Sequence, residues 1–400
     1  MTHRNKALLL VLLASIITIQ AVACSETTED TNNTVEVPDN AAQALETYAQ
    51  IVHANYEDSL TAAASMDQAL EAFVAAPDAA GLEAARQAWL DSREPYLQTE
   101  VFRFYDGPID NADDGPEGLL NAWPMDENYI DYVQDNPDAG VVNDTTVTID
   151  AATIEGLNEA GGEKNIATGY HAIEFLLWGQ DLSADGPGDR PHTDYITDGS
   201  GTAANQDRRA QYLTVSSDLL QEHLQAMVDA WADGGDNYRA EFLAADDKEG
   251  LRRVLTGMIV LSGFETGGER LQTALDSGDQ EDEHSCFADN THRDMVQDIQ
   301  GVLNVWEGSY TRLDGTTVSG PGIKDVVEAV DSELAAGLDA KIKESLNLAN
   351  ALQPPFDQEI AVDNAEGRAR VQALITALRQ QESMLEEVFL KFGLSIPEPE

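Results

Sequence analysis

Hydrophobic residues recur at helical spacing along most of the chain. Apolar positions three and four residues apart mark seven long segments, whereas the alternating runs typical of strands are scarce. Two shorter segments, 149–159 and 167–178, show the same spacing. The pattern predicts an all-α protein with two helical bundles. The long segments cover residues 40–75, 79–105, 205–232, 248–275, 290–306, 326–351 and 365–392.

Long irregular stretches interrupt the helical pattern at residues 106–147, 179–203 and 276–289. Each is rich in acidic residues, Gly or Pro, and compact domains usually keep loops of this length only where they serve a function. The stretch that ends at residue 203 suggests a boundary between an N-terminal helical bundle, residues 40–203, and a C-terminal bundle, residues 204–393.

A weak internal echo relates the two halves. Gly169-Tyr170-His171 leads into Glu174 and a Gly- and Asp-rich loop with a histidine, and Gly263-Phe264-Glu265 leads into Glu269 and an acidic loop with a histidine. The spacings differ, so chance remains one explanation and duplication of a four-helix bundle the other. The echo makes Glu265 and Glu269 candidates for an additional site.

The first 23 residues have the pattern of a secretory signal, with basic Arg4 and Lys6 ahead of an apolar run. The run ends in Ala-Val-Ala before Cys24, which resembles the lipobox of bacterial lipoproteins. We therefore expect cleavage before Cys24, its lipidation, and a flexible tether over residues 24–39. The expected location is the outer membrane or the periplasmic face, with the lipid anchor as the sole membrane contact. The alternative is ordinary cleavage that releases a soluble protein.

Acidic residues far outnumber basic ones, 73 Asp and Glu against 23 Lys and Arg, for a formal net charge of −50. Such a field repels phosphate, so nucleic acid is excluded as a partner. It suits a saline environment and also attracts cations, and the two roles are compatible. The other cysteine is Cys286, so acylation of Cys24 would leave no intramolecular disulfide.

His171 and Glu174 lie in the apolar run GYHAIEFLLWGQD. Residues three apart share a helix face, and an imidazole beside a carboxylate suits iron, zinc or copper. The zinc-peptidase motifs HExxH and HxxEH are not matched, because Ala172 follows the histidine and Phe175 follows the glutamate. A core histidine hydrogen-bonded to a glutamate remains the alternative.

Residues 281–294 hold two histidines and five carboxylates. Glu281 and His284 have the ExxH spacing of carboxylate-bridged metal bundles, and Asp289 and His292 follow. Such ligands suit iron or manganese, and the purely acidic part suits calcium. A solvated acidic loop that caps the next helix explains the same composition.

Charged residues near the end of the second predicted helix form another candidate group. Pro95 predicts a kink there. Glu100 and Arg103 are spaced to pair with each other or to reach a neighbouring pocket. Arg190, in the Gly- and Pro-rich loop after the GYH motif, is a further candidate.

Taken together, these motifs resemble the imelysin family. Gly169, His171 and Glu174 match its GxHxxE pattern. The flanking stretches REPYLQTEVFRFYDGPID, GPEGLLNAWPMDENYID, GPGDRPHTDY and DQEDEHSCFADNTHRD are similar to its iron-regulated protein A branch. The resemblance spans residues 42–392, nearly the whole chain after the tether.

The resemblance implies an exported, often lipid-anchored bacterial protein with two helical bundles, from a family many of whose members are linked to iron acquisition or regulation. It makes His171 and Glu174 metal ligands and Gly169 the small residue that opens their helix. We expect the protein to bind a divalent metal or an iron-bearing ligand, iron first and zinc as the alternative, and to work with an envelope uptake partner. The rival functions are a zinc-dependent metallopeptidase, which the residues support poorly, and a non-catalytic surface or haem-binding module.

Overall fold

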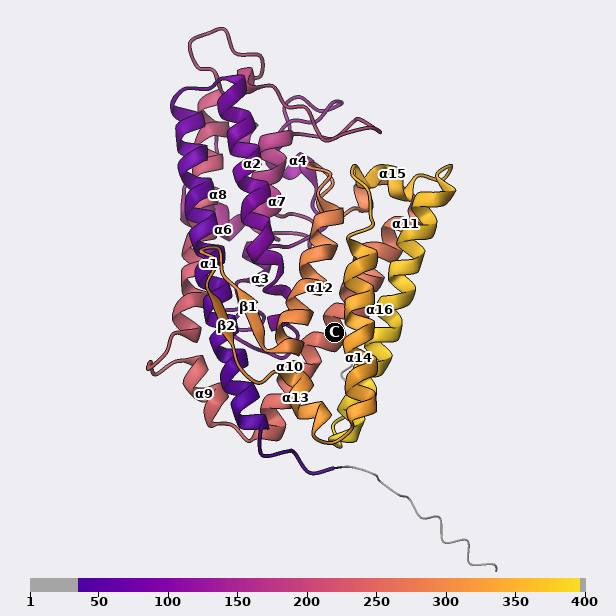
Figure 1. The fold of residues 1–400 in the computed structure, drawn as a ribbon. Helices are drawn as coiled ribbons and strands as arrows, with labels where there is room; N and C mark the ends of the chain where they lie inside the picture. Colours follow the sequence, from indigo (N-terminus) through magenta and orange to yellow (C-terminus); the bar gives the residue numbers. More distant parts are fainter. Residues whose placement is uncertain (1–34, 396–400) are drawn as a thin grey trace, which may run out of the picture. The chain divides into compact units, whose positions relative to one another are not determined.

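Amphipathic helices make up most of residues 35–395, the part of the chain that the computed structural model describes (Figure 1). This confirms the predicted all-α class. A short antiparallel hairpin accompanies the helices: β1 (Ser309–Thr311) pairs with β2 (Thr317–Ser319), with Tyr310 opposite Val318.

The N-terminal helices pack lengthwise on one another. α1 (Ala41–Ala75) lies along both α2 (Ala79–Leu97) and α8 (Gln206–Trp231). α7 (Gly169–Trp178) packs between α2 and α8. α7 is apolar along its length apart from His171 and Glu174, so it can be covered on all sides, and every one of its residues is buried.

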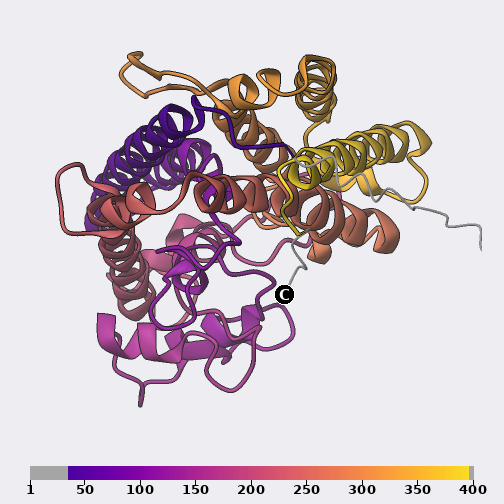
Figure 2. The same cartoon turned by 90° about the horizontal axis from the view of Figure 1, so that it is seen from below.

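The C-terminal helices form a second layer beside the first. α16 (Ala365–Lys391) packs on α14 (Ser332–Ala349) and on the π-helical segment η3 (Val260–Gln272). α12 (Thr291–Glu307) contacts both α14 and α2 and so connects the two layers. Figures 1 and 2 both place α1 and α8 on one side and α14 and α16 on the other.

Shorter elements connect the long helices. The α-helices are α3 (Glu117–Leu120), α4 (Glu127–Ile130), α5 (Gly140–Asn143), α6 (Ala151–Leu157), α9 (Tyr238–Ala244), α10 (Asp247–Ile259), α11 (Thr273–Ser277), α13 (Ile323–Glu328) and α15 (Phe356–Ile360). The 3-10 turns are η1 (Glu100–Phe102), η2 (His192–Tyr195) and η4 (Gln280–Asp282).

Three predicted helices differ from the structure. The helix predicted over residues 79–105 ends at Leu97, two residues after Pro95, whose missing N–H and ring weaken the last turn by removing the bond to the carbonyl of Asp91. The helix predicted over 326–351 is interrupted, because Asp331 caps the start of α14 by accepting a hydrogen bond from the Leu334 N–H at 2.9 Å. The helix predicted over 248–275 changes to π geometry at Val260.

The predicted loop over residues 106–147 contains three four-residue helices, α3, α4 and α5, so it is less irregular than expected. α8 begins just after the predicted boundary at residue 203 and still packs along α1. The two-domain division and the duplicated bundle stay predictions.

The signal segment, Cys24 and the tether up to residue 34 lie outside the described residues. Among residues 35–395, every helix falls short of the length or the apolar character that crossing a membrane requires.

Candidate functional site

Gly169 starts the helix that carries the motif histidine. Its φ of +80° lies in the region that side chains disfavour, and a Cβ there would approach the Leu120 carbonyl oxygen to 2.4 Å. Glycine therefore lets the first turn of α7 pack directly against the backbone at the end of α3. The Thr168 hydroxyl fixes the same junction by donating to the Leu119 carbonyl at 3.0 Å.

His171 and Glu174 form a fully buried pair. The distance from His171 Nδ1 to Glu174 Oε2 is 2.8 Å, and neither side chain is exposed. The Ala288 N–H donates to the other carboxylate oxygen at 2.9 Å. Both oxygens of Glu174 are thus engaged, whereas the buried Nε2 atom of His171 has no hydrogen-bond partner.

A second histidine–carboxylate pair lies against the first. The Nδ1 atom of His284 is 2.7 Å from Asp294 Oδ2, and the His171 and His284 rings meet edge to face with their centroids 4.9 Å apart. Asp294 also accepts from the Ser285 hydroxyl and lies 3.4 Å from Arg93 Nη2. We call His171 and His284 the histidine pair.

The surroundings keep both imidazoles neutral at pH 7. Burial, followed by the charge of Arg93, holds the pKa of His171 well below its usual range. Burial and Arg270 lower the pKa of His284 to about 4, although Asp294 opposes the shift. Neutral imidazole is the form that binds metal ions.

Charged side chains continue the site away from the histidine pair. Arg270 lies 2.5 Å from Glu100 Oε2 and 2.8 Å from Asp298 Oδ2. Arg103 pairs with Glu100 at 2.8 Å and with Glu117 at 3.0 Å. Burial opposes ionisation of Glu100, but Arg103 and Arg270 lower its pKa to about 2.

A cavity of about 380 Å³ opens beside His284 and this ionic network. We call it the central cavity. Its lining combines acids, bases, a histidine and one tryptophan, so it can receive a hydrated cation or a polar ligand. The polar and aromatic residues that line it are Arg103, Glu117, Asn121, Trp123, Glu159, Glu265, Glu269, Arg270, Thr273, Asp282 and His284.

The structure brings many of the predicted site residues together. His284 joins His171 and Glu174 through ring contact, and Glu100 connects to the cavity through Arg103 and Arg270. The two glutamates suggested by the internal echo, Glu265 and Glu269, both line the cavity.

Four other predicted residues lie elsewhere. Glu281 is exposed, and His292 is half-buried with Nδ1 3.2 Å from the Asp289 carbonyl oxygen. Asp289 faces a separate group of carboxylates. Arg190 binds Asp131 at 2.8 Å. The assignment of metal ligands among all these residues stays a prediction.

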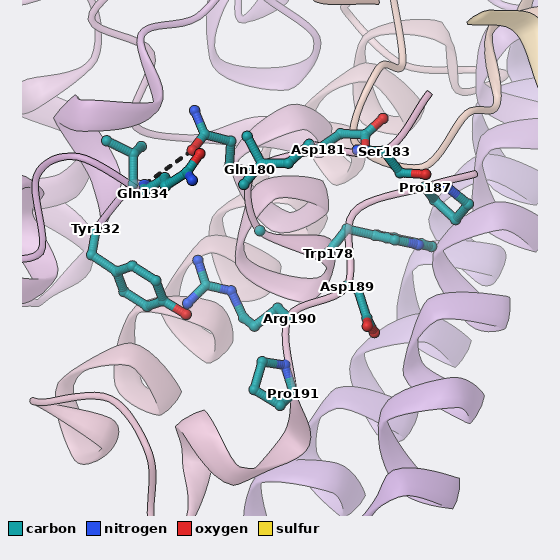
Figure 3. A pocket seen from close by; sticks show the side chains of 13 residues that line it. Tyr132, Gln134, Trp178, Gln180, Asp181, Ser183, Pro187, Asp189, Arg190 and Pro191 are labelled. Atoms are coloured by element: carbon teal, nitrogen blue, oxygen red, sulfur yellow. Dashed lines mark hydrogen bonds between the residues drawn. The ribbon is translucent and has the colours of Figure 1, made fainter. Parts of the chain in front are cut away.

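Arg190 lines a different cavity, of about 450 Å³, together with Trp178, Tyr132 and Asp181 (Figure 3). Its guanidinium lies 4.8 Å from the centre of the Tyr132 ring. The cavity that holds Arg190 does not include the histidine pair.

The sequence did not single out Trp123 or Arg270 as site residues. The Trp123 ring lies 4.9 Å from the His171 ring, centre to centre. Arg270 follows Glu269 directly, and the signal that could have found it is its rarity: it is one of 23 basic residues in a strongly acidic chain. Its partners Glu100 and Asp298 are far away in sequence, so spacing alone could not reveal the network.

The fold and the site define an all-α protein whose buried histidine pair adjoins a charged cavity. A sequence profile described as Imelysin matches residues 52–385. The chain belongs to the imelysin family, which confirms the resemblance inferred from its motifs.

Known proteins of this kind resemble the chain over most of its length. Iron-regulated protein A of Synechococcus elongatus is 25% identical over 350 residues, which cover 85% of this chain and 83% of the relative. The structure of an iron-regulated protein A precursor from Parabacteroides distasonis has a TM-score of 0.68 at 18% identity, over 89% of this chain and 96% of its own.

An imelysin-like protein from Psychrobacter arcticum has a TM-score of 0.63 at 14% identity and covers 90% of this chain and 99% of its own. At these identities the two structural likenesses establish the fold alone. The curated relative is named for its regulation by iron.

Proposed function

We propose that this protein binds a divalent metal ion, iron first, at the histidine pair and assists iron acquisition at the bacterial envelope. One observation carries the proposal: two buried imidazoles in ring contact are each held through Nδ1 by a carboxylate. A histidine that binds a metal through one ring nitrogen usually donates the other N–H to a carboxylate or carbonyl. This arrangement supports Nε2 of His171 and of His284 as the ligand atoms.

Glu174 then acts as a positioning residue in our proposal. Its two oxygens are engaged by His171 Nδ1 and the Ala288 N–H. This refines the sequence-based prediction, in which Glu174 was a ligand itself. Two imidazoles leave most coordination positions for water or for oxygen atoms of an iron-bearing ligand in the central cavity, which suits binding and release of cargo.

The same contacts weigh against the rival proposal of a zinc peptidase. Hydrolysis at zinc requires an activated water molecule and usually a carboxylate that takes its proton. Glu174, the acid nearest to His171 in the motif, already uses both of its oxygens.

The envelope part of the proposal rests on the signal segment and Cys24. A lipid attached to Cys24 and the tether up to residue 39 would hold the folded body near the membrane, within reach of an uptake partner. Incorporation of labelled fatty acid into the full chain, and its loss in a Cys24→Ala variant, tests this step.

Titration of the purified protein with Fe(II) under anaerobic conditions tests metal binding. We expect one site, with affinity reduced at least about 100-fold in the His171→Ala, His284→Ala double variant because both ligands are lost. The His53→Ala variant is the matched control, since His53 is half-buried on α1 and 3.9 Å from Glu57.

Unchanged affinity and stoichiometry in the double variant would refute the assignment to the histidine pair. Parallel titration with Zn(II), and element analysis of protein isolated from its native envelope, distinguish an iron carrier from a zinc protein.

A further inference from the structure

Four carboxylates from three separate segments meet outside the histidine pair. Asp181 follows α7, Glu283 and Asp289 precede α12, and Asp357 lies in α15. Asp181, Asp289 and Asp357 each offer an oxygen atom, and these atoms lie within 4.8 Å of one another. We call these four residues the acidic cluster.

The acidic cluster is buried. The exposed fractions are 2% for Asp181, 5% for Asp289, 7% for Asp357 and 0% for Glu283. Both oxygens of Glu283, Asp289 and Asp357 lack a hydrogen-bond partner, as does Oδ2 of Asp181. None of the four forms an ion pair with another residue in the described range 35–395.

Glu283 is not one of the three aspartates whose oxygen atoms lie within 4.8 Å of one another, and it supplies a separate observation. It has no exposed surface, both of its oxygens lack hydrogen-bond partners, and its carboxyl lies beside that of Asp357. Burial and then Asp357 raise the pKa of Asp289 to about 8, and burial raises that of Asp181 to about 6. Buried like charges without a counter-ion are costly, so the cluster needs a cation or protons.

We propose that the acidic cluster binds a calcium ion, at a site separate from the histidine pair. The donors are all carboxylate oxygens, with no imidazole or thiolate that would favour iron or zinc. Three oxygen atoms within 4.8 Å of one another all lie within about 2.8 Å of a common centre, so a small inward movement brings them to the calcium–oxygen distance of about 2.3–2.6 Å.

Calcium suits this cluster better than magnesium. Magnesium keeps several water molecules and requires near-octahedral geometry, whereas calcium accepts six to eight oxygens in flexible arrangements. Carboxylates brought together from two loops and a short helix form an irregular set of ligands, which calcium accepts. Asp181 also lines the cavity of Figure 3, so that cavity adjoins the cluster.

A calcium ion here would connect three segments of the chain. The loop between Glu283 and Asp289 also carries His284 and Ala288, which contact His171 and Glu174. Calcium would therefore hold in place the loop that completes the histidine pair.

Thermal unfolding and calorimetric titration of the full chain with CaCl₂ alone test the site. Calcium should bind and raise the Tm of the wild type by about 3 °C or more at saturation. In the Asp181→Asn, Asp357→Asn double variant the affinity should fall about 100-fold and the Tm shift should vanish, because ligand charge sets calcium affinity. Without calcium the same variant should be at least as stable as the wild type, since it removes buried like charges.

Asp363→Asn is the matched control, an exposed aspartate six residues beyond Asp357 that should behave as the wild type. MgCl₂ at equal concentration controls for ionic strength. The proposal is overturned by a wild type that does not bind calcium, by a double variant that binds it equally well, or by a magnesium effect as large as that of calcium. A double variant less stable than the wild type without calcium would also contradict it. Each outcome is independent of whether the histidine pair binds iron.

Discussion

At the scale of single residues, the histidine pair owes its geometry to carboxylates that hold each ring through Nδ1. Glu174 holds His171 at 2.8 Å, and Asp294 holds His284 at 2.7 Å. Arg93 stabilises the ionised form of Asp294 and lies 4.9 Å from the centre of the Tyr170 ring. The histidine pair is thus supported by the buried charges of Asp294 and Arg93, and the Tyr170 ring packs against Arg93.

The first prediction separates a positioning residue from a ligand. Glu174→Ala should reduce metal affinity by about 10–100-fold, because a lost orienting carboxylate costs less than a lost ligand. His171→Ala should reduce it further. Chelator competition measures both, and a loss in Glu174→Ala equal to or larger than that in His171→Ala would show direct ligation by the glutamate.

The second prediction concerns Glu100. Its folded pKa of about 2 lies below the unfolded value of about 4.3, so its ionisation stabilises the fold above about pH 4.3 and ceases to do so as the pH falls toward 2. Glu100→Gln should lower the free energy of unfolding at pH 7 by about 3 kcal/mol, because it leaves Arg270 with one buried partner fewer.

Denaturant unfolding at several pH values measures this effect, and the variant should show a flatter pH dependence between about 4.3 and 2. The exposed Glu71→Gln substitution is the control. A Glu100→Gln variant with wild-type stability and slope would contradict the assigned role.

At the scale of elements, two segments place the site: α7 and η3. α7 is fully buried. The spacing of His171 and Glu174 predicted that they share a helix face, and the flanking family motifs identified them as candidate ligands. No pattern in the sequence predicted the π geometry of η3. Within η3, Gly263 allows α16 to approach closely, because a Cβ there would lie 1.9 Å from Glu382 Cδ. From η3, Thr266 and Arg270 reach Asp298 at 3.2 and 2.8 Å.

The third prediction belongs to α7. Gly169→Ala should destabilise the protein by about 3 kcal/mol, since it combines a disfavoured φ with a backbone clash at Leu120. Gly156→Ala in α6 is the control: no atom lies within 4 Å of its added Cβ, and alanine favours helix. Equal unfolding free energies for the two variants would show that the close approach at Gly169 is unimportant.

At the scale of the whole molecule, contacts between residues far apart in the chain form the parts of the site that could not be predicted from the sequence. The helix pattern predicted the all-α class and most long helices, because periodicity is local. The contact of His171 with His284 joins residues far apart in the chain, and Asp357 carries no local signal of a site. Such juxtapositions depend on how the two helical layers pack.

The fourth prediction follows from the net charge of −50. Mutual repulsion of surface carboxylates opposes the compact state, and salt screens it over about 10 Å at 0.1 M and about 3 Å at 1 M. Raising NaCl from about 0.1 M to 1 M should therefore raise Tm in a thermal unfolding experiment. A Tm that stays constant or falls would show that surface repulsion contributes little.

Anomalous diffraction from crystals grown anaerobically with Fe(II), recorded at the iron absorption edge, tests the central proposal most directly. We predict one strong peak about 2.1 Å from Nε2 of both His171 and His284, with Glu174 still bound to Nδ1 of His171. If the protein is fully loaded with iron and the anomalous peak lies away from the histidine pair, the proposal is contradicted.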